Sequence, residues 1–160
     1  ILIGGFGNFL LPFFCNSADL KMPRSNSFSL WLICGSDILF VRSFSFNDSG
    51  VGWTLYPPLS SIKFSGGGVD FLLLSIHLAG LSSLVGSINF ILSLMSSKAR
   101  KDLNRVQVLA WSYMFTSMLL LLSLPVLASG ITMLLFDRNL NFCFFDPAGG
   151  GDPILFQHLF

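Results

Sequence analysis

Two long stretches of the chain carry apolar residues without any formal charge. The first, Phe71–Met95, contains 25 residues and the second, Val106–Phe136, contains 31. An α-helix needs about 20 apolar residues to cross the hydrocarbon core of a bilayer, and uncharged stretches of this length predict such a helix. A helix that is apolar on every side is not typical of the surface of a water-soluble domain. Both stretches are therefore predicted to be transmembrane helices.

Shorter apolar stretches predict further spans. Phe28–Phe46 is interrupted only by Asp37 and Arg42, and Ile1–Phe14 is apolar but short. A lone carboxylate at mid-span costs roughly 2.5–3.5 kcal/mol, so Asp37 is expected to face protein or water. Ile154–Phe160 begins another apolar stretch. The predicted fold is all-α: a polytopic transmembrane helix bundle of four spans, the first of them truncated, plus the start of a fifth.

The few charged residues predict on which side of the membrane each loop lies. Basic residues concentrate in loops on the cytoplasmic or matrix side. Consecutive spans alternate in direction, so the loops after the first and third spans share one side. Those loops contain six of the nine basic residues: Lys21, Arg24, Lys98, Arg100, Lys101 and Arg105. Five of the eight acidic residues fall on the other side: Asp48, Asp70, Asp137, Asp146 and Asp152. The pattern supports four spans and predicts that the Lys98–Arg105 loop is inside.

Composition narrows the class of protein. Of 160 residues, 52% are hydrophobic and only 11% are charged, against about 25% charged in a typical soluble chain. Eighteen phenylalanines exclude disorder, and a net charge of +1 implies no general attraction to nucleic acid. The three cysteines are scattered and suit neither a disulfide framework nor a metal site. Because both ends fall within apolar runs, residues 1–160 are expected to be a single fragment of one larger transmembrane domain.

Small and polar residues form a stripe along the third predicted span. Its members are Ser75, Ala79, Ser82, Gly86, Asn89 and Ser93. Their alternating spacing of four and three residues places them on one helical face. The stripe can be a seam of small residues where helices pack closely, or a hydrated polar lining, which the larger amide of Asn89 favours. These patterns alone leave a transporter, a channel and a redox enzyme open.

His77 lies in the same span. A histidine inside the membrane is a candidate metal ligand or proton relay. A metal site needs several ligands in a set geometry, and neither an H-x₃-H nor an E-x-x-H spacing accompanies His77. A hydrogen-bonded structural histidine is the favoured interpretation. His158 has no recognisable partner in the sequence either.

Five strings of residues resemble one protein family, in order along the chain. They are IGGFGNF (Ile3–Phe9), GWTLYPPLSS (Gly52–Ser61), HLAGLSS (His77–Ser83), and the nearly continuous Leu119–Phe142 and Phe144–Phe160. Together they resemble subunit I of the haem–copper cytochrome c oxidases over nearly the whole chain. The resemblance implies part of a twelve-helix fold and of a catalytic subunit. That subunit reduces oxygen to water with electrons from cytochrome c and pumps protons.

The resemblance also implies cofactors, partners and a location. Haem a, haem a3 and copper B belong to the full-length subunit, and their ligands are expected outside these 160 residues. The implied partners are oxidase subunits II and III, cytochrome c through subunit II, and the lipid bilayer. The implied location is the mitochondrial inner membrane, with a bacterial plasma membrane as the alternative. The alternative function is a transporter or channel that uses the polar stripe. The isolated 160 residues are not expected to be active.

The family's proton pathway is carried over residue by residue. Its entry carboxylate matches Asp19, within the string SADLKMPRSNS (Ser17–Ser27). The other matching pathway residues are Asn8, Asn26, Ser29, Ser82, Ser83 and Asn89. A surface carboxylate would collect protons, and the amide and hydroxyl groups would order a chain of water. Trp53 and Tyr56 match family positions near the oxygen-reducing centre.

Overall fold

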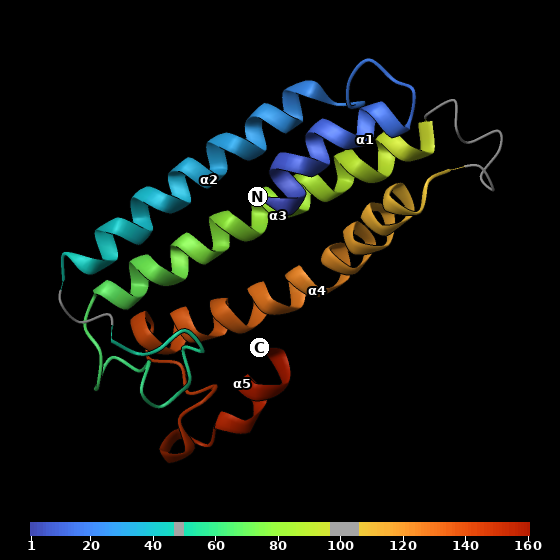
Figure 1. The fold of residues 1–160 in the computed structure, drawn as a ribbon. Helices are drawn as coiled ribbons and strands as arrows, with labels where there is room; N and C mark the ends of the chain where they lie inside the picture. The colour runs from blue at the N-terminus through green and yellow to red at the C-terminus, as the bar shows by residue number, and fades with distance from the viewer. Residues whose placement is uncertain (47–49, 97–105) are drawn as a thin grey trace. The chain divides into compact units, whose positions relative to one another are not determined.

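The computed structural model describes residues 1–46, 50–96 and 106–160. Within these residues all regular structure is helical, as Figure 1 shows, which confirms the all-α prediction. A π-helical turn, a 3₁₀ turn and two short α-helices accompany the three longer helices. In chain order the elements are η1 (Leu2–Gly7), α1 (Asn8–Phe14), α2 (Pro23–Phe44), α3 (Gly68–Ser96), α4 (Val108–Asn139), the 3₁₀ turn η3 (Pro147–Gly149) and α5 (Pro153–Leu159).

Three of these helices are long and apolar enough to cross a membrane. They are α2, α3 and α4, with 22, 29 and 32 residues. At 1.5 Å per residue even α2 extends about 33 Å, the thickness of a bilayer core. The first predicted span corresponds to the shorter apolar helix Leu2–Phe14, and α5 lies where the fifth was expected. The Lys98–Arg105 loop, which contributes to the predicted sidedness, lies outside the described residues.

Proline and aspartate explain where several helices begin. Pro23 opens α2 and Pro153 opens α5, at the first position of a helix, where the missing N–H has no intrahelical partner to lose. Asp152 precedes Pro153 and caps α5 by accepting the Ile154 N–H at 2.9 Å. Asp146 caps η3 in the same way, through the Ala148 N–H at 3.0 Å.

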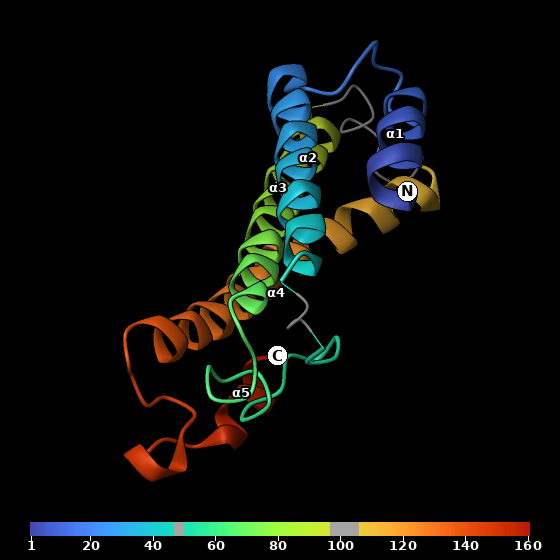
Figure 2. The ribbon, with the colours of Figure 1, turned by 90° about the vertical axis from the view of Figure 1, so that its left-hand side faces the viewer.

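The described chain forms two compact units. Unit 1 comprises Ile1–Trp31 and Leu81–Ser123, and unit 2 comprises Leu32–Gly80 and Leu124–Phe160. Each of α2, α3 and α4 contributes a segment to both units. The course of each helix can be followed by its colour in Figure 2.

The core of unit 1 joins α1 to α3 and α4. It contains Leu11, Cys15, Leu20, Phe90, Leu94 and Ala110. Gly7 permits the close approach of α1, because a Cβ there would lie 3.1 Å from the Phe90 ring and 3.2 Å from the Tyr113 ring. The Tyr113 hydroxyl donates to the Leu2 carbonyl oxygen at 3.1 Å, which fastens the first helical turn to α4.

The core of unit 2 joins α3, α4 and α5 to the segment that connects α2 with α3. Its members are Val51, Leu55, Val69, Leu73, Ile131, Leu134, Phe145 and Phe156. Leu55 is buried although its backbone has a φ of 52°, a left-handed conformation that is costly for leucine. At Gly130 of α4 a Cβ would lie 3.2 Å from the Cβ of Leu159, so the missing side chain lets α5 approach.

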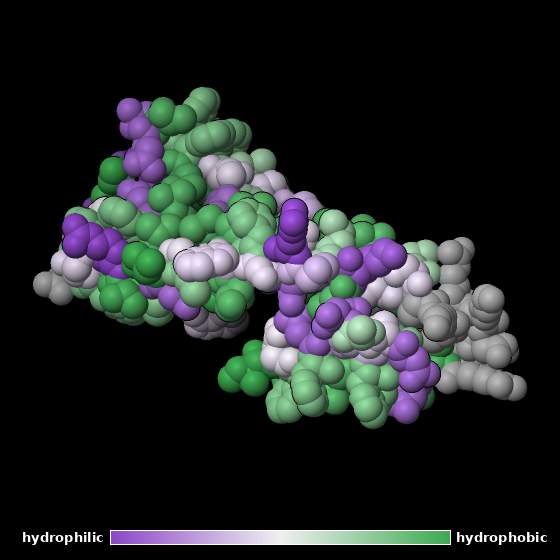
Figure 3. All heavy atoms as spheres, turned by 90° about the horizontal axis from the view of Figure 1, so that it is seen from above, coloured by the Kyte–Doolittle hydropathy of each residue, from purple (hydrophilic) through white to green (hydrophobic). Residues whose placement is uncertain are grey.

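The long helices point apolar side chains outward and bury polar ones. Trp31 and Leu122 are each 74% exposed, and hydrophobic residues cover much of the face seen in Figure 3. Buried polar residues on the same helices include Ser36, Ser75, Ser82, Ser87, Asn89, Ser93 and Ser117. A helix surface of this kind suits lipid or other apolar surroundings, where every polar group must find its partner inside the protein.

Candidate functional site

All seven candidate pathway residues belong to unit 1. Asp19 is exposed in the loop between α1 and α2. The others are distributed over three helices: Asn8 on α1, Asn26 and Ser29 on α2, and Ser82, Ser83 and Asn89 on α3. Residues separated by up to 81 positions in the sequence therefore share one compact unit.

Asn89 holds the loop that carries Asp19. Its side chain is 1% exposed, and both of its polar atoms bind one residue of the loop. Oδ1 accepts the Met22 N–H at 3.1 Å, and Nδ2 donates to the Met22 carbonyl oxygen at 3.2 Å. Ser93 adds a parallel contact, since its Oγ accepts the Lys21 N–H at 2.8 Å. The segment two residues after Asp19 is thus fastened to α3.

The polar stripe of α3 also binds α2 itself. In unit 1, Ser82 Oγ donates to the Ser29 carbonyl oxygen at 2.7 Å. In unit 2, Ser36 Oγ donates to the Ser75 carbonyl oxygen at 2.8 Å. Pairing partners rise along α2 as they fall along α3, so the helices are antiparallel. These contacts support the interpretation of the stripe as a packing seam, reinforced by hydrogen bonds. Ser83 is exposed beside it.

The two polar atoms of the Asn8 side chain differ in their hydrogen bonding. Its Nδ2 donates to the Gly4 carbonyl oxygen at 2.6 Å. Its Oδ1 is buried and has no hydrogen-bond partner among the described residues. Buried polar atoms in proteins are nearly always satisfied, by ordered water where no protein group is available. An ordered water at Asn8 is therefore expected.

Trp53 and Tyr56 lie in unit 2, in the segment that connects α2 with α3. Trp53 is 86% exposed and meets the edge of Phe160, with ring centroids 6.4 Å apart. Tyr56 is half-buried, and its hydroxyl accepts a hydrogen bond from Gln157 Nε2. The Tyr56 ring also meets Phe156 at a centroid distance of 6.3 Å. Both aromatic residues thus contact the last residues of the chain.

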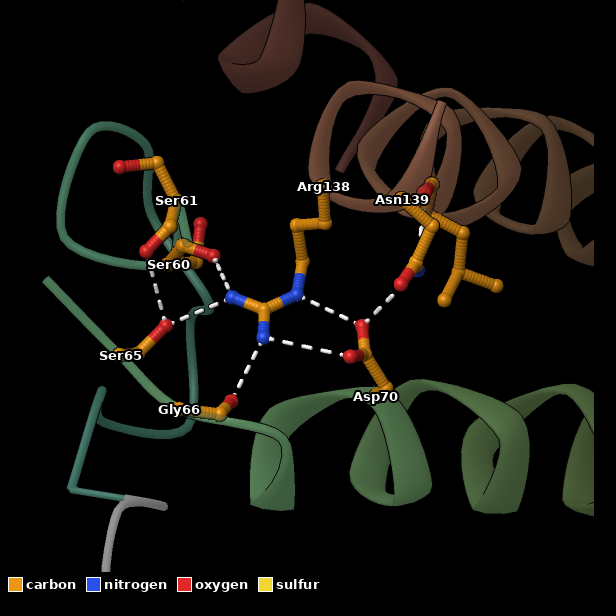
Figure 4. A network of polar contacts seen from close by, with 8 residues as sticks. Ser60, Ser61, Ser65, Gly66, Asp70, Arg138 and Asn139 are labelled. Carbon is orange, nitrogen blue, oxygen red and sulfur yellow. Dashed lines mark hydrogen bonds and ion pairs between the residues drawn. The ribbon is translucent and has the colours of Figure 1, made fainter. Parts of the chain in front are cut away.

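Unit 2 contains a polar cluster that sequence reasoning did not predict. Arg138, near the end of α4, is 2% exposed and pairs with Asp70 in the first turn of α3, Nε to Oδ1 at 2.7 Å (Figure 4). Asn139 Nδ2 donates to the same Asp70 oxygen at 3.2 Å. A signal for this pair exists in the sequence. Asp70 directly precedes one uncharged stretch and Arg138 closely follows the next, and antiparallel helices bring those two ends together.

The histidines and cysteines form no metal centre in the described part of the chain. No group of three or more His, Cys, Asp or Glu side chains there could hold a metal ion. His77 Nδ1 lies 3.1 Å from the Leu73 carbonyl oxygen, a contact within its own helix, and its Nε2 is buried without a protein partner. His158 is exposed on α5.

The fold and these contacts define a polytopic membrane protein with an internal polar seam. Comparison with known proteins specifies the family. Residues 1–160 match the family described as "Cytochrome C and Quinol oxidase polypeptide I", and the chain belongs to it. Membership confirms the resemblance seen in the sequence and implies a full subunit that contains haem and copper.

Individual relatives match over the whole chain. It is 49% identical over 164 residues to "Cytochrome c oxidase subunit 1" of Pecten maximus. Proteins of the same name from Eremothecium gossypii and Mytilus edulis are 47% and 49% identical over 167 and 170 residues. All of the chain is covered in each comparison, but only 34%, 30% and 30% of the relatives. The chain thus spans about a third of their length.

Proposed function

We propose that this chain is part of the catalytic subunit of a cytochrome c oxidase. The complete enzyme transfers electrons from cytochrome c to oxygen, forms water and pumps protons across the membrane. One observation carries the proposal: 49% identity over the entire chain to a relative named for this activity. Helices that bury serine and asparagine while exposing apolar residues support a membrane-embedded role.

Within that enzyme, residues 1–160 supply the first part of a proton pathway. Asp19 collects protons at the surface, and Asn8, Asn26, Ser29, Ser82, Ser83 and Asn89 line the route that follows. Support comes from their gathering in unit 1. Further support is the buried Asn8 Oδ1, an acceptor that calls for water. Amide and hydroxyl groups suit such a route because they orient water without becoming charged themselves.

The rest of the site belongs to the full-length subunit. Haem a, haem a3 and copper B are held by residues outside 1–160 and supply the redox chemistry. Trp53 and Tyr56 lie near the oxygen-reducing centre. The partners are subunits II and III and cytochrome c, and the complex resides in the mitochondrial inner membrane. Residues 1–160 form part of one transmembrane domain.

Replacement of Asp19 by asparagine in the complete enzyme tests the pathway. The amide cannot accept and release a proton, so Asp19→Asn is expected to lower turnover and proton uptake by about tenfold, less than the 10²–10⁴ of a group acting in the chemical step. Oxygen consumption and pH changes in proteoliposomes measure both quantities.

The matched control is Asp37→Asn, which removes an exposed carboxylate of α2 outside the proposed route. It is expected to leave both rates within about twofold of the wild type, because no pathway residue depends on it. Wild-type turnover and pumping in Asp19→Asn would contradict the pathway. A purified complete protein that consumes no oxygen with reduced cytochrome c would contradict the oxidase itself.

A further inference from the structure

Arg138 uses every hydrogen-bond donor of its side chain. A guanidinium has five N–H groups in a rigid planar fork. Nε donates to Asp70 Oδ1 at 2.7 Å, and Nη2 donates to Asp70 Oδ2 at 3.5 Å and to the Gly66 carbonyl oxygen at 2.6 Å. Nη1 donates to the Ser60 carbonyl oxygen at 2.5 Å and to Ser65 Oγ at 2.6 Å. The buried cation is therefore fully satisfied.

These acceptors come from two elements other than α4. Asp70 belongs to α3, whereas Ser60, Ser65 and Gly66 belong to the segment that connects α2 with α3 (Figure 4). One side chain thus fixes that segment against the ends of two helices. A buried charge pair costs desolvation whether or not it holds anything in place. The five hydrogen bonds of Arg138 instead indicate that it holds the segment between α2 and α3 in one conformation.

The residues on either side of Arg138 extend the same arrangement. Both carboxylate oxygens of Asp137 accept main-chain N–H groups, from Phe144 and Phe145, each at 2.9 Å. Asn139 donates to Asp70, as described above. Three consecutive residues at the end of α4 therefore bind three different parts of unit 2. We call Asp70, Asp137, Arg138 and Asn139 the polar clamp.

A short chain of bonds links the polar clamp to Tyr56. Arg138 binds the carbonyl oxygen of Ser60, and the N–H of Ser60 donates to the carbonyl oxygen of Tyr56 at 3.2 Å. Tyr56 in turn follows Leu55, which is held in a left-handed conformation. At its far end the Tyr56 hydroxyl meets Gln157 of α5. Only one residue separates the guanidinium from the backbone of the tyrosine.

We propose that Arg138 is a positioning residue for Tyr56. The Arg138 guanidinium binds Ser60 and so fixes the turn from which the Tyr56 side chain reaches Gln157. The inference rests on the proposed function in one respect: the position of Tyr56 affects turnover only if the protein is an oxidase. The structural half of the inference concerns unit 2 alone.

Hydrogen–deuterium exchange of the complete enzyme tests the structural half. Lysine keeps the charge but has only three donors, so Arg138→Lys loses at least two of the five bonds. Amides of residues 59–66 are expected to exchange at least about tenfold faster, with α2 unchanged, because opening becomes local. Arg42→Lys, an exposed arginine of α2, is the matched control and leaves residues 59–66 unchanged. Unchanged exchange in Arg138→Lys overturns the proposal, as does an equal increase throughout the protein.

Steady-state kinetics tests the action through Tyr56. Arg138→Lys is expected to lower kcat roughly tenfold, since a misplacement of about 1 Å can cost a hundredfold, with KM for cytochrome c unchanged. In a Tyr56→Phe background the same change should cost less than about twofold, because coupled residues are not additive. Full additivity overturns the role, and so does wild-type turnover in Tyr56→Phe. Absence of oxygen consumption in every variant contradicts the oxidase instead, while exchange still decides the positioning.

A milder variant covers the case in which Arg138→Lys fails to assemble. Ser65→Ala removes one of the five acceptors and leaves the ion pair with Asp70 intact. Exchange of residues 59–66 is then expected to rise about threefold, and kcat to fall by a similar factor, both smaller than for the lysine variant. An assembled Ser65→Ala enzyme with unchanged exchange would contradict the proposed role of Arg138.

Discussion

The side chain of Asn89 binds the loop that carries Asp19 through both of its polar atoms. Asn89 forms two hydrogen bonds with the backbone of Met22, the pairing that a neighbouring β-strand would offer. Its amide is therefore engaged with protein on both polar atoms. As a pathway residue, Asn89 would act through the placement of the Asp19 loop as much as through contact with water.

Truncation of Asn89 separates these tasks. Asn89→Ala removes the acceptor of the Met22 N–H, at a cost of roughly 1 kcal/mol, while the Met22 carbonyl oxygen keeps the Asn26 N–H at 3.1 Å. We expect faster deuterium exchange in residues 17–26 of the complete protein. Ser87→Ala is the control, because its buried hydroxyl donates to the Ser83 carbonyl oxygen of the same helix. Equal exchange of residues 17–26 in the two variants would show that Asn89 does not hold the loop.

At the scale of helices, glycine decides how closely two elements approach. Gly7 lies against the Phe90 and Tyr113 rings, whereas a Cβ at Gly86 of α3 would meet no described residue beyond its own helix within 4 Å. An alanine methyl group would therefore contact two aromatic rings at position 7 and no neighbouring element at position 86.

This contrast predicts opposite effects for one substitution. Gly7→Ala is expected to destabilise the complete protein by about 1–3 kcal/mol, because rings packed in a core cannot move aside freely. Gly86→Ala should be neutral or stabilise by up to about 1 kcal/mol, the difference in helix propensity. The rate of thermal inactivation in detergent measures both. A Gly7→Ala protein as stable as Gly86→Ala would contradict the close packing of α1.

The long helices could be predicted from the sequence because absence of charge over 25 and 31 residues is a property of the letters themselves. The apolar run of the second span begins at Phe28, whereas α2 begins at Pro23, since charged residues such as Arg24 can occupy a first helical turn outside the apolar run. The polar clamp was not predicted from the sequence. Most groups that accept from Arg138 are the carbonyl oxygens of Ser60 and Gly66 and the hydroxyl of Ser65. Every residue has a carbonyl, so no letter marks the ones that bind.

At the scale of the whole molecule, the alternation of spans predicts that successive loops lie on opposite sides of the membrane. Ser17 lies before α2, and Ile62 lies between α2 and α3 and is 58% exposed. The loops before and after α2 are thus predicted to lie on opposite sides. The grouping of residues 1–160 in one domain stays a prediction, since the described residues form two compact units.

Single cysteines at these two positions test the sidedness. In a complete protein without its native accessible cysteines, a membrane-impermeant maleimide should label Ser17→Cys only from the matrix or cytoplasmic side and Ile62→Cys only from the other. The bilayer forbids an exposed loop from lying within it, so α2 must separate the two sites. Labelling of both from one side would contradict the crossing of α2. Equal labelling of both in detergent is the control.

The polar clamp has a consequence for biosynthesis. Arg138 is synthesised 78 residues after Ser60 and 68 after Asp70. At roughly 5–20 residues per second, the ribosome needs on the order of ten seconds to bridge that interval. Throughout that time Asp70 and the loop before it lack the Arg138 cation. Arg138 can therefore bind the connection between α2 and α3 only after α4 is complete.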